Sequence, residues 1–306
     1  MPRFKPPTPE ETQRALGPLE SLPANLVRAL TDVSAFSRLP KPRRGEWLAE
    51  FPEPGQSPKQ YERKWAKCTP HAYFTTLYIV PVGTFEPALL EQLRTYAAAF
   101  FCCEVKVAPG VALADVRQRA RTGAEGQLQL LADDIFAVMR RKPPRDAFAQ
   151  VAVTKEDLYH KEEWNFVFGL AVAADAVGVF SFARYHDGAI GAPAATLGAE
   201  KRRLLLLRSC RVLCHETAHV MGLAHCIHAR CLMNGSNSLE ESDTHPLNLC
   251  PVCLRKLYAA VGFDATARYE AIRRAATALG FDEHARWIGE RLGEKCEPCD
   301  EGAACA

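Results

Sequence analysis

The sequence predicts an α+β protein in which helices pack on a mixed, twisted sheet, much as they do in α/β proteins. Segments rich in β-branched and aromatic residues alternate with amphipathic segments over residues 73–154. Two further strand-like segments, 166–171 and 178–185, lie close enough along the chain to pair. Separated strands followed by a strand pair are typical of a mixed sheet. A long helix with much apolar surface is expected next, over about 202–223.

Residue type and spacing predict the elements of the first half of this sheet. Residues 73–82 are rich in β-branched and aromatic side chains, which favours a strand. Apolar residues recur at three- and four-residue spacing over 86–101, which favours a helix. In chain order we expect a strand at 73–82, a helix at 86–101, a strand at 103–107, a helix at 127–139 and a strand at 147–154.

The two ends of the chain are expected to flank a main domain at residues 71–270. More than half of the prolines precede residue 59, so residues 1–70 are expected to form an arm that wraps over the core in extended segments, with a helix near 9–32. Residues 271–306 are expected to form helices and a tail that holds Cys296, Cys299 and Cys305. The helices expected in the last part of the chain are 254–260, 265–279 and 282–292.

Residues 215–225 have the form H-E-x-x-H-x-x-G-x-x-H, which predicts a three-histidine zinc site. Residues four apart on a helix lie on one face, so His215 and His219 can hold the same cation. Gly222 can adopt a positive φ and turn the chain back, which brings in His225 as the third ligand. Glu216 lies beside the ion and is the candidate general base. This extended pattern, followed by a Met-turn, is typical of metzincins, a class of zinc peptidases.

Four cysteines that follow the histidines predict a second zinc ion. Cys226 and Cys231 form one pair, and Cys250 and Cys253 form the other. Four thiolates leave no position open for substrate, so this Cys₄ site is expected to be structural. The alternative is two disulfides. We favour zinc because residues 1–7 have no apolar leader segment, which predicts a cytoplasmic protein with reduced thiols.

These features resemble the archaemetzincin family of zinc metallopeptidases, and most closely its archaemetzincin-2-like branch. The resemblance covers roughly residues 70–270. It implies a metzincin-type zincin catalytic domain with a long active-site helix and an added Cys₄ zinc element, and it implies activity on peptide or protein substrates. It also implies that Met233 forms the Met-turn that floors the catalytic site. The residues that carry it are the run from His215 to Cys253 and the segments 164–169, 178–185 and 208–210.

The expected mechanism is hydrolysis of a peptide bond, with Glu216 taking a proton from water at the zinc. The alternative is a zinc-binding regulatory or interaction protein with weak or no peptidase activity, and the presence of Glu216 favours the enzyme. The strand at 178–185 is the expected sheet edge for pairing with an extended substrate. The default expectation for each of the other histidines is an exposed or hydrogen-bonded side chain, and His228 and His245, which lie inside the zinc region, are the two candidates for contact with substrate.

Composition argues against other classes of protein. The 306 residues are 48% hydrophobic, which allows a sizeable core. A net charge of +2 with short, separate basic clusters argues against nucleic-acid and membrane-surface binding, and no apolar run approaches the length of a membrane span. We therefore expect a monomeric peptidase with two zinc ions per chain, one catalytic and one structural.

Overall fold

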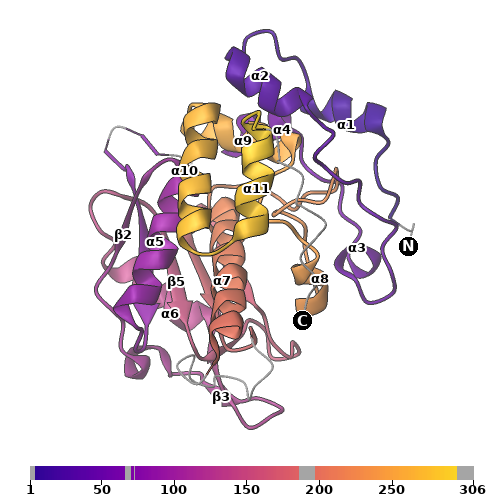
Figure 1. Cartoon of the computed structure of the whole chain (residues 1–306). Coiled ribbons are helices and arrows are strands. Elements are labelled where there is room, and N and C mark those ends of the chain that lie inside the picture. Colours follow the sequence, from indigo (N-terminus) through magenta and orange to yellow (C-terminus); the bar gives the residue numbers. More distant parts are fainter. Residues whose placement is uncertain (1–3, 66–69, 72, 186–196, 295–306) are drawn as a thin grey trace, which may run out of the picture.

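A mixed sheet of five strands forms the centre of the computed structural model, which describes residues 4–65, 70–71, 73–185 and 197–294 (Figure 1). Neighbouring strands from β2 to β8 are parallel, whereas β7 runs antiparallel to β8. The predicted mixed sheet with packed helices is therefore confirmed. In their order across the sheet, the strands are β2 (Glu104–Val107), β1 (Thr76–Val82), β5 (Ala147–Thr154), β8 (Val177–Ser181) and β7 (Gly169–Val172).

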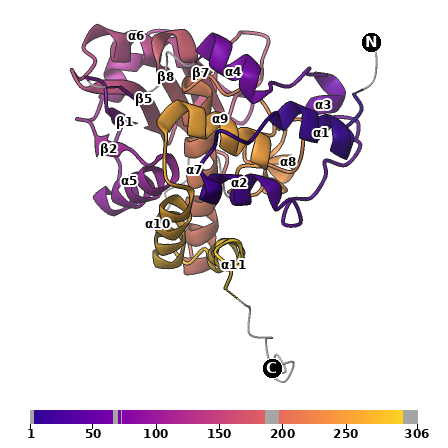
Figure 2. The same cartoon turned by 90° about the horizontal axis from the view of Figure 1, so that it is seen from above.

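Helices cover both faces of this sheet (Figure 2). The helices α5 (Pro87–Phe101) and α7 (Ala199–Val220) pack against one face, and α6 (Ala132–Arg141) packs against the other. Successive strand residues point to opposite faces. Val151 and Val153 of β5 therefore join the apolar cluster around α5 and α7, while Ala152 joins the cluster around α6. The long helix α7 is thus held against the sheet along its apolar side.

The strand predicted at 147–154 has the predicted bounds, and the C-terminal helices agree closely with expectation. The helix α10 (Ala265–Ala278) packs against α5 and against α11 (Asp282–Arg291). The third predicted helix, α9, spans Pro251–Val261. None of the helices in the described ranges combines the length and the apolar character needed to cross a membrane.

The helix predicted at 127–139 is wrong in its first part. Residues Leu128–Leu131 form the strand β4, which pairs in parallel with β6 (Asp157–Tyr159), and α6 begins only after it. Gln129 accounts for the difference, because its buried side-chain amide donates to Asp157 Oδ2 and to the Asn165 carbonyl, each at 2.7 Å. These partners satisfy a polar group that has no access to water. The strands β4 and β6 belong to a second, three-stranded sheet, in which β3 (Arg121–Thr122) pairs antiparallel with β4.

The helix predicted near 9–32 is two helices, α1 (Pro9–Leu16) and α2 (Ala24–Thr31). Gly17 ends α1 with a φ of 76°, and proline is the residue before α2. Leu26 and Leu30 of α2 belong to the main apolar core, so this part of the arm packs on the body of the protein. The later helices of the arm are α3 (Trp47–Glu50) and α4 (Pro58–Trp65).

The five-stranded sheet has β2 at one edge and β7 at the other, and the prediction that residues 178–185 form an edge is wrong. The strand β8 lies between β5 and β7, so its backbone is already paired on both sides. A short 3₁₀ turn (Ala173–Asp175) reverses the chain between β7 and β8. Of these two strands, only β7 has a side on which a further strand could pair.

Candidate active site

The end of α7 places two of the predicted histidines on one helix face and turns back to bring in the third. Gly222 has a φ of 88°, and its N–H donates to the His219 carbonyl at 2.8 Å. The Leu223 N–H donates to the Ala218 carbonyl at 2.9 Å. These two bonds form a Schellman motif with glycine at its left-handed position. The chain leaves the helix there and returns His225 to the same side as His215 and His219.

The three histidines each offer a ring nitrogen to one common point, where the ligand atoms lie within 4.8 Å of one another. Their other nitrogens are held by acceptors. Nδ1 of His215 lies 2.8 Å from the Leu232 carbonyl, and Nδ1 of His219 lies 2.6 Å from the Leu223 carbonyl. Nδ1 of His225 lies 2.9 Å from Glu53 Oε1. An Nδ1–H that donates to such an acceptor leaves the Nε2 lone pair free for a metal, so the donor set fits zinc.

Burial keeps two of these imidazoles, those of His215 and His219, neutral, which is the form that binds metal. It lowers the pKa of His215 to about 3, and it lowers the pKa of His219 well below its usual value. Neighbouring histidines add to the effect in both cases.

Glu216 lies in the same pocket as the histidines, and its side chain packs against β7. The residue is 7% exposed, and burial raises the pKa of its carboxyl to about 8. Gly169 leaves room for the carboxylate, since a Cβ at that position would lie 2.5 Å from Glu216 Oε1. We did not identify Gly169 from the sequence. A glycine inside a strand is the signal for such a close approach.

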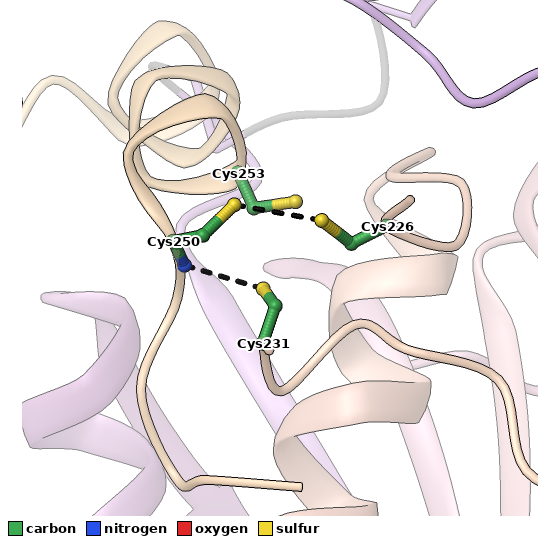
Figure 3. A group of neighbouring side chains, drawn as sticks. All are labelled: Cys226, Cys231, Cys250 and Cys253. Carbon is green, nitrogen blue, oxygen red and sulfur yellow. Dashed lines mark hydrogen bonds between the residues drawn. The ribbon is translucent and has the colours of Figure 1, made fainter. Parts of the chain in front are cut away.

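The four cysteines predicted to bind a second metal lie together in the core, and all four are buried (Figure 3). Their sulfur atoms are within 4.8 Å of one another, and Cys226 Sγ lies 3.5 Å from Cys250 Sγ. A disulfide needs about 2.05 Å, whereas zinc–sulfur bonds of about 2.3 Å place tetrahedral ligands about 3.8 Å apart. Both predicted pairs are therefore free thiols arranged as one tetrad.

Backbone N–H groups surround the sulfur atoms of this tetrad. The Cys250 N–H donates to Cys231 Sγ at 3.2 Å, and the His228 N–H donates to Cys226 Sγ at 3.4 Å. Hydrogen bonds from the other three thiols lower the pKa of Cys226 well below its usual value. The surroundings thus stabilise a thiolate, the form that binds zinc, at Cys226, whereas burial and hydrogen bonds within the tetrad raise the pKa values of Cys231 and Cys250 well above their usual value.

The cysteine tetrad also supports the histidine site. Leu232, whose carbonyl faces His215, lies between Cys231 and the fully buried Met233. Asn234 fixes this loop, because its side chain accepts from the Cys231 N–H at 2.8 Å and donates to the Cys226 carbonyl at 2.9 Å. Asn234 was not identified from the sequence. The predicted tail cysteines Cys296, Cys299 and Cys305 lie outside the described residues.

A pocket of about 610 Å³ opens over the histidines and Glu216. Much of its apolar wall comes from β7, the segment before β7, and the arm, and the rest of the wall comes from α7 and residues 225–245. Phe51 and Trp164 remain 49% and 40% exposed at this pocket. His245 also lines it, and burial lowers the pKa of His245 to about 3. His228 lies elsewhere, beside α4 and the start of the arm.

Comparison with known proteins gives the family. A family model described as "Peptidase family M54" matches residues 128–259. Archaemetzincin-2 of Rattus norvegicus is 37% identical over 254 residues, which cover 74% of this chain and 71% of that protein. Archaemetzincin-2 of Homo sapiens is also 37% identical, over 75% of this chain and 71% of that protein. The crystal structure of archaemetzincin from Methanopyrus kandleri is 27% identical with a TM-score of 0.48, over 63% of this chain and 99% of that one.

The similarity to archaemetzincin-2 extends over about three-quarters of the chain, and the family model spans the histidine and cysteine groups described above. The chain therefore belongs to the archaemetzincin family of zinc metallopeptidases, peptidase family M54.

Proposed function

We propose that the protein hydrolyses peptide bonds with a zinc ion held by His215, His219 and His225, and with Glu216 as the general base. One observation carries this proposal: the three imidazole nitrogens converge in a pocket that also contains the buried Glu216 carboxylate. When bound, zinc lowers the pKa of a coordinated water towards about 7 and polarises the substrate carbonyl. The pKa of the Glu216 carboxyl is raised to about 8, and it is the ionised form that accepts the water proton and then delivers it to the departing amine.

We further propose that an extended substrate pairs with β7, the edge strand, and so passes over the histidines. Main-chain hydrogen bonds to β7 would hold the peptide, and alternate side chains would face the protein. Leu170 and Ala171 of β7 line the pocket. The exposed rings of Phe51 and Trp164 favour an apolar substrate side chain between them.

The cysteine tetrad is proposed to hold the second, structural zinc ion. Support comes from four buried sulfur atoms in one cluster and from the loop that connects the cluster to His215. Closed thiolate sites contribute folding free energy and leave no position for substrate. We propose a metzincin-type catalytic domain over residues 71–270, with the 1–70 arm packed on it and the C-terminal helices following.

Cleavage of a random peptide library, with and without a strong chelator, tests the proposed activity. We expect cleavage that stops on metal removal and returns with added zinc, with apolar residues enriched at one position next to the cleaved bond. Bound zinc without any cleavage would instead support the alternative of a zinc-binding regulatory protein. Cleavage without an apolar preference would contradict the role given to the aromatic rim of the pocket.

A further inference from the structure

The N-terminal arm reaches the histidine site through residues 47–56, where α3 lies beside α8 (Leu239–Asp243) (Figure 1). The segment is anchored at both ends. At the start, the Trp47 N–H donates to Glu241 Oε1 of α8 at 3.0 Å. At the end, the Gln56 side chain donates to the Gly222 carbonyl at 3.1 Å and accepts from the Ala224 N–H at 3.0 Å. These anchors leave Glu53, between them, facing the third histidine.

One oxygen of Glu53 accepts two hydrogen bonds. His225 Nδ1 and Trp47 Nε1 each lie 2.9 Å from Glu53 Oε1. The indole N–H of tryptophan can only donate, so the glutamate oxygen must be the acceptor. The Trp47 ring also packs edge-on against the His225 ring, with centroids 5.0 Å apart. The ring of His225 is thereby fixed on two sides, with its Nδ1 pointing away from the other histidines.

His225 differs from the other two histidines in where its support comes from. Backbone carbonyls in the loop just after α7 hold His215 and His219. The acceptor for His225 is a side chain 172 residues earlier in the chain. Glu53 is only 26% exposed, and its side chain lies within the protein beside the His225 imidazole.

We infer that Glu53 is a positioning residue for His225, and that the N-terminal arm therefore contributes to metal binding at the histidine site. The inference rests on the proposed zinc site at the three histidines. A carboxylate that accepts from the far nitrogen of a metal-binding histidine fixes the ring orientation and the tautomer, and it raises the basicity of the ligating nitrogen. Removing such a partner typically costs about 10- to 100-fold in metal affinity.

Zinc affinity measured by chelator competition tests this inference in three variants of the full chain. Glu53→Ala should bind zinc at the histidine site about 10- to 100-fold more weakly than wild type. Glu53→Gln should keep most of the affinity, because the Trp47 N–H requires an acceptor at this position and so directs the amide oxygen towards His225. Glu50→Gln is the matched control, since Glu50 is an exposed carboxylate of the same arm that lies outside the pocket.

The same titration of His219→Ala, which lacks the histidine site, measures the zinc bound by the cysteine tetrad alone. This value is the baseline for zinc binding at the histidine site. The absorption spectrum of bound cobalt provides a second readout that needs no turnover, and we expect it to change in Glu53→Ala but not in Glu50→Gln. Wild-type affinity in Glu53→Ala, or a loss in Glu53→Gln as large as that in Glu53→Ala, would overturn the inference. If wild type and His219→Ala bind the same amount of zinc, the proposed histidine site itself is wrong.

Discussion

Glu216→Ala is expected to lower kcat by about 10²- to 10⁴-fold, the usual contribution of a positioned general acid or base, while the fold and the bound zinc are retained. Among the described residues that line the pocket, Glu216 alone carries a carboxylate, so no neighbour can take over its role. The variant should be no less stable than wild type at neutral pH, because burial raises the pKa of the Glu216 carboxyl to about 8 and folding must therefore protonate a group that is ionised in the unfolded chain. Glu216 is therefore expected to lower the stability of the folded protein while it serves the reaction, as active-site residues often do.

The measurement is kcat on a cleaved library peptide, together with the zinc content of the same preparation. Glu240→Gln is a suitable control, since Glu240 is exposed on α8 and lies outside the pocket. Its kcat should equal that of wild type. Undiminished zinc-dependent hydrolysis by Glu216→Ala would remove Glu216 from the mechanism.

Cys250→Ser is expected to lose the structural zinc ion and most of the folded protein. Cys250 is fully buried, its Sγ lies 3.5 Å from Cys226 Sγ, and it directly precedes α9. Structural zinc contributes about 10 to 16 kcal/mol in small zinc domains, which matches or exceeds the roughly 5 to 15 kcal/mol that hold a typical domain together. A serine hydroxyl does not replace a thiolate as a zinc ligand.

Circular dichroism during thermal unfolding measures this loss. Cys102→Ser is the matched control, because Cys102 is exposed at the end of α5, and it should unfold as wild type does. Wild type should tolerate a reducing agent without added chelator but unfold when a strong chelator removes the metal. A Cys250→Ser variant with normal zinc content and normal unfolding would contradict a structural role for the cysteine tetrad.

Local sequence patterns were sufficient to predict the elements whose side chains are all in the same kind of surroundings, such as a strand that is buried on both faces. The strand at 147–154 is apolar nearly throughout and buried on both faces, so its bounds follow from the sequence alone. The grouping of the histidines follows from helical spacing and one glycine, and the grouping of the cysteines follows from two close pairs. The histidine contacts lie within one helix and the turn that follows it, and the cysteine contacts join that turn to the start of α9.

Contacts between distant segments explain what the sequence did not predict. Residues 128–131 form a strand because Gln129 meets Asp157, which no helical pattern reveals. The identity of the edge strand also depends on a distant contact. The strands β7 and β8 follow each other in the chain, and their spacing does not indicate which of them pairs with β5 and which is left at the edge. Glu53 is separated from His225 by 172 residues, and a single glutamate in a proline-rich arm carries no sequence signal.

Zinc analysis of the purified protein beside His219→Ala tests the central claim most directly. The account predicts two zinc ions per chain in wild type, one for each of the two ligand groups. It predicts one zinc ion in His219→Ala, with the fold retained because the cysteine tetrad is intact. A single zinc ion in wild type, or two in a folded His219→Ala variant, would contradict the division into an open histidine site and a closed cysteine site.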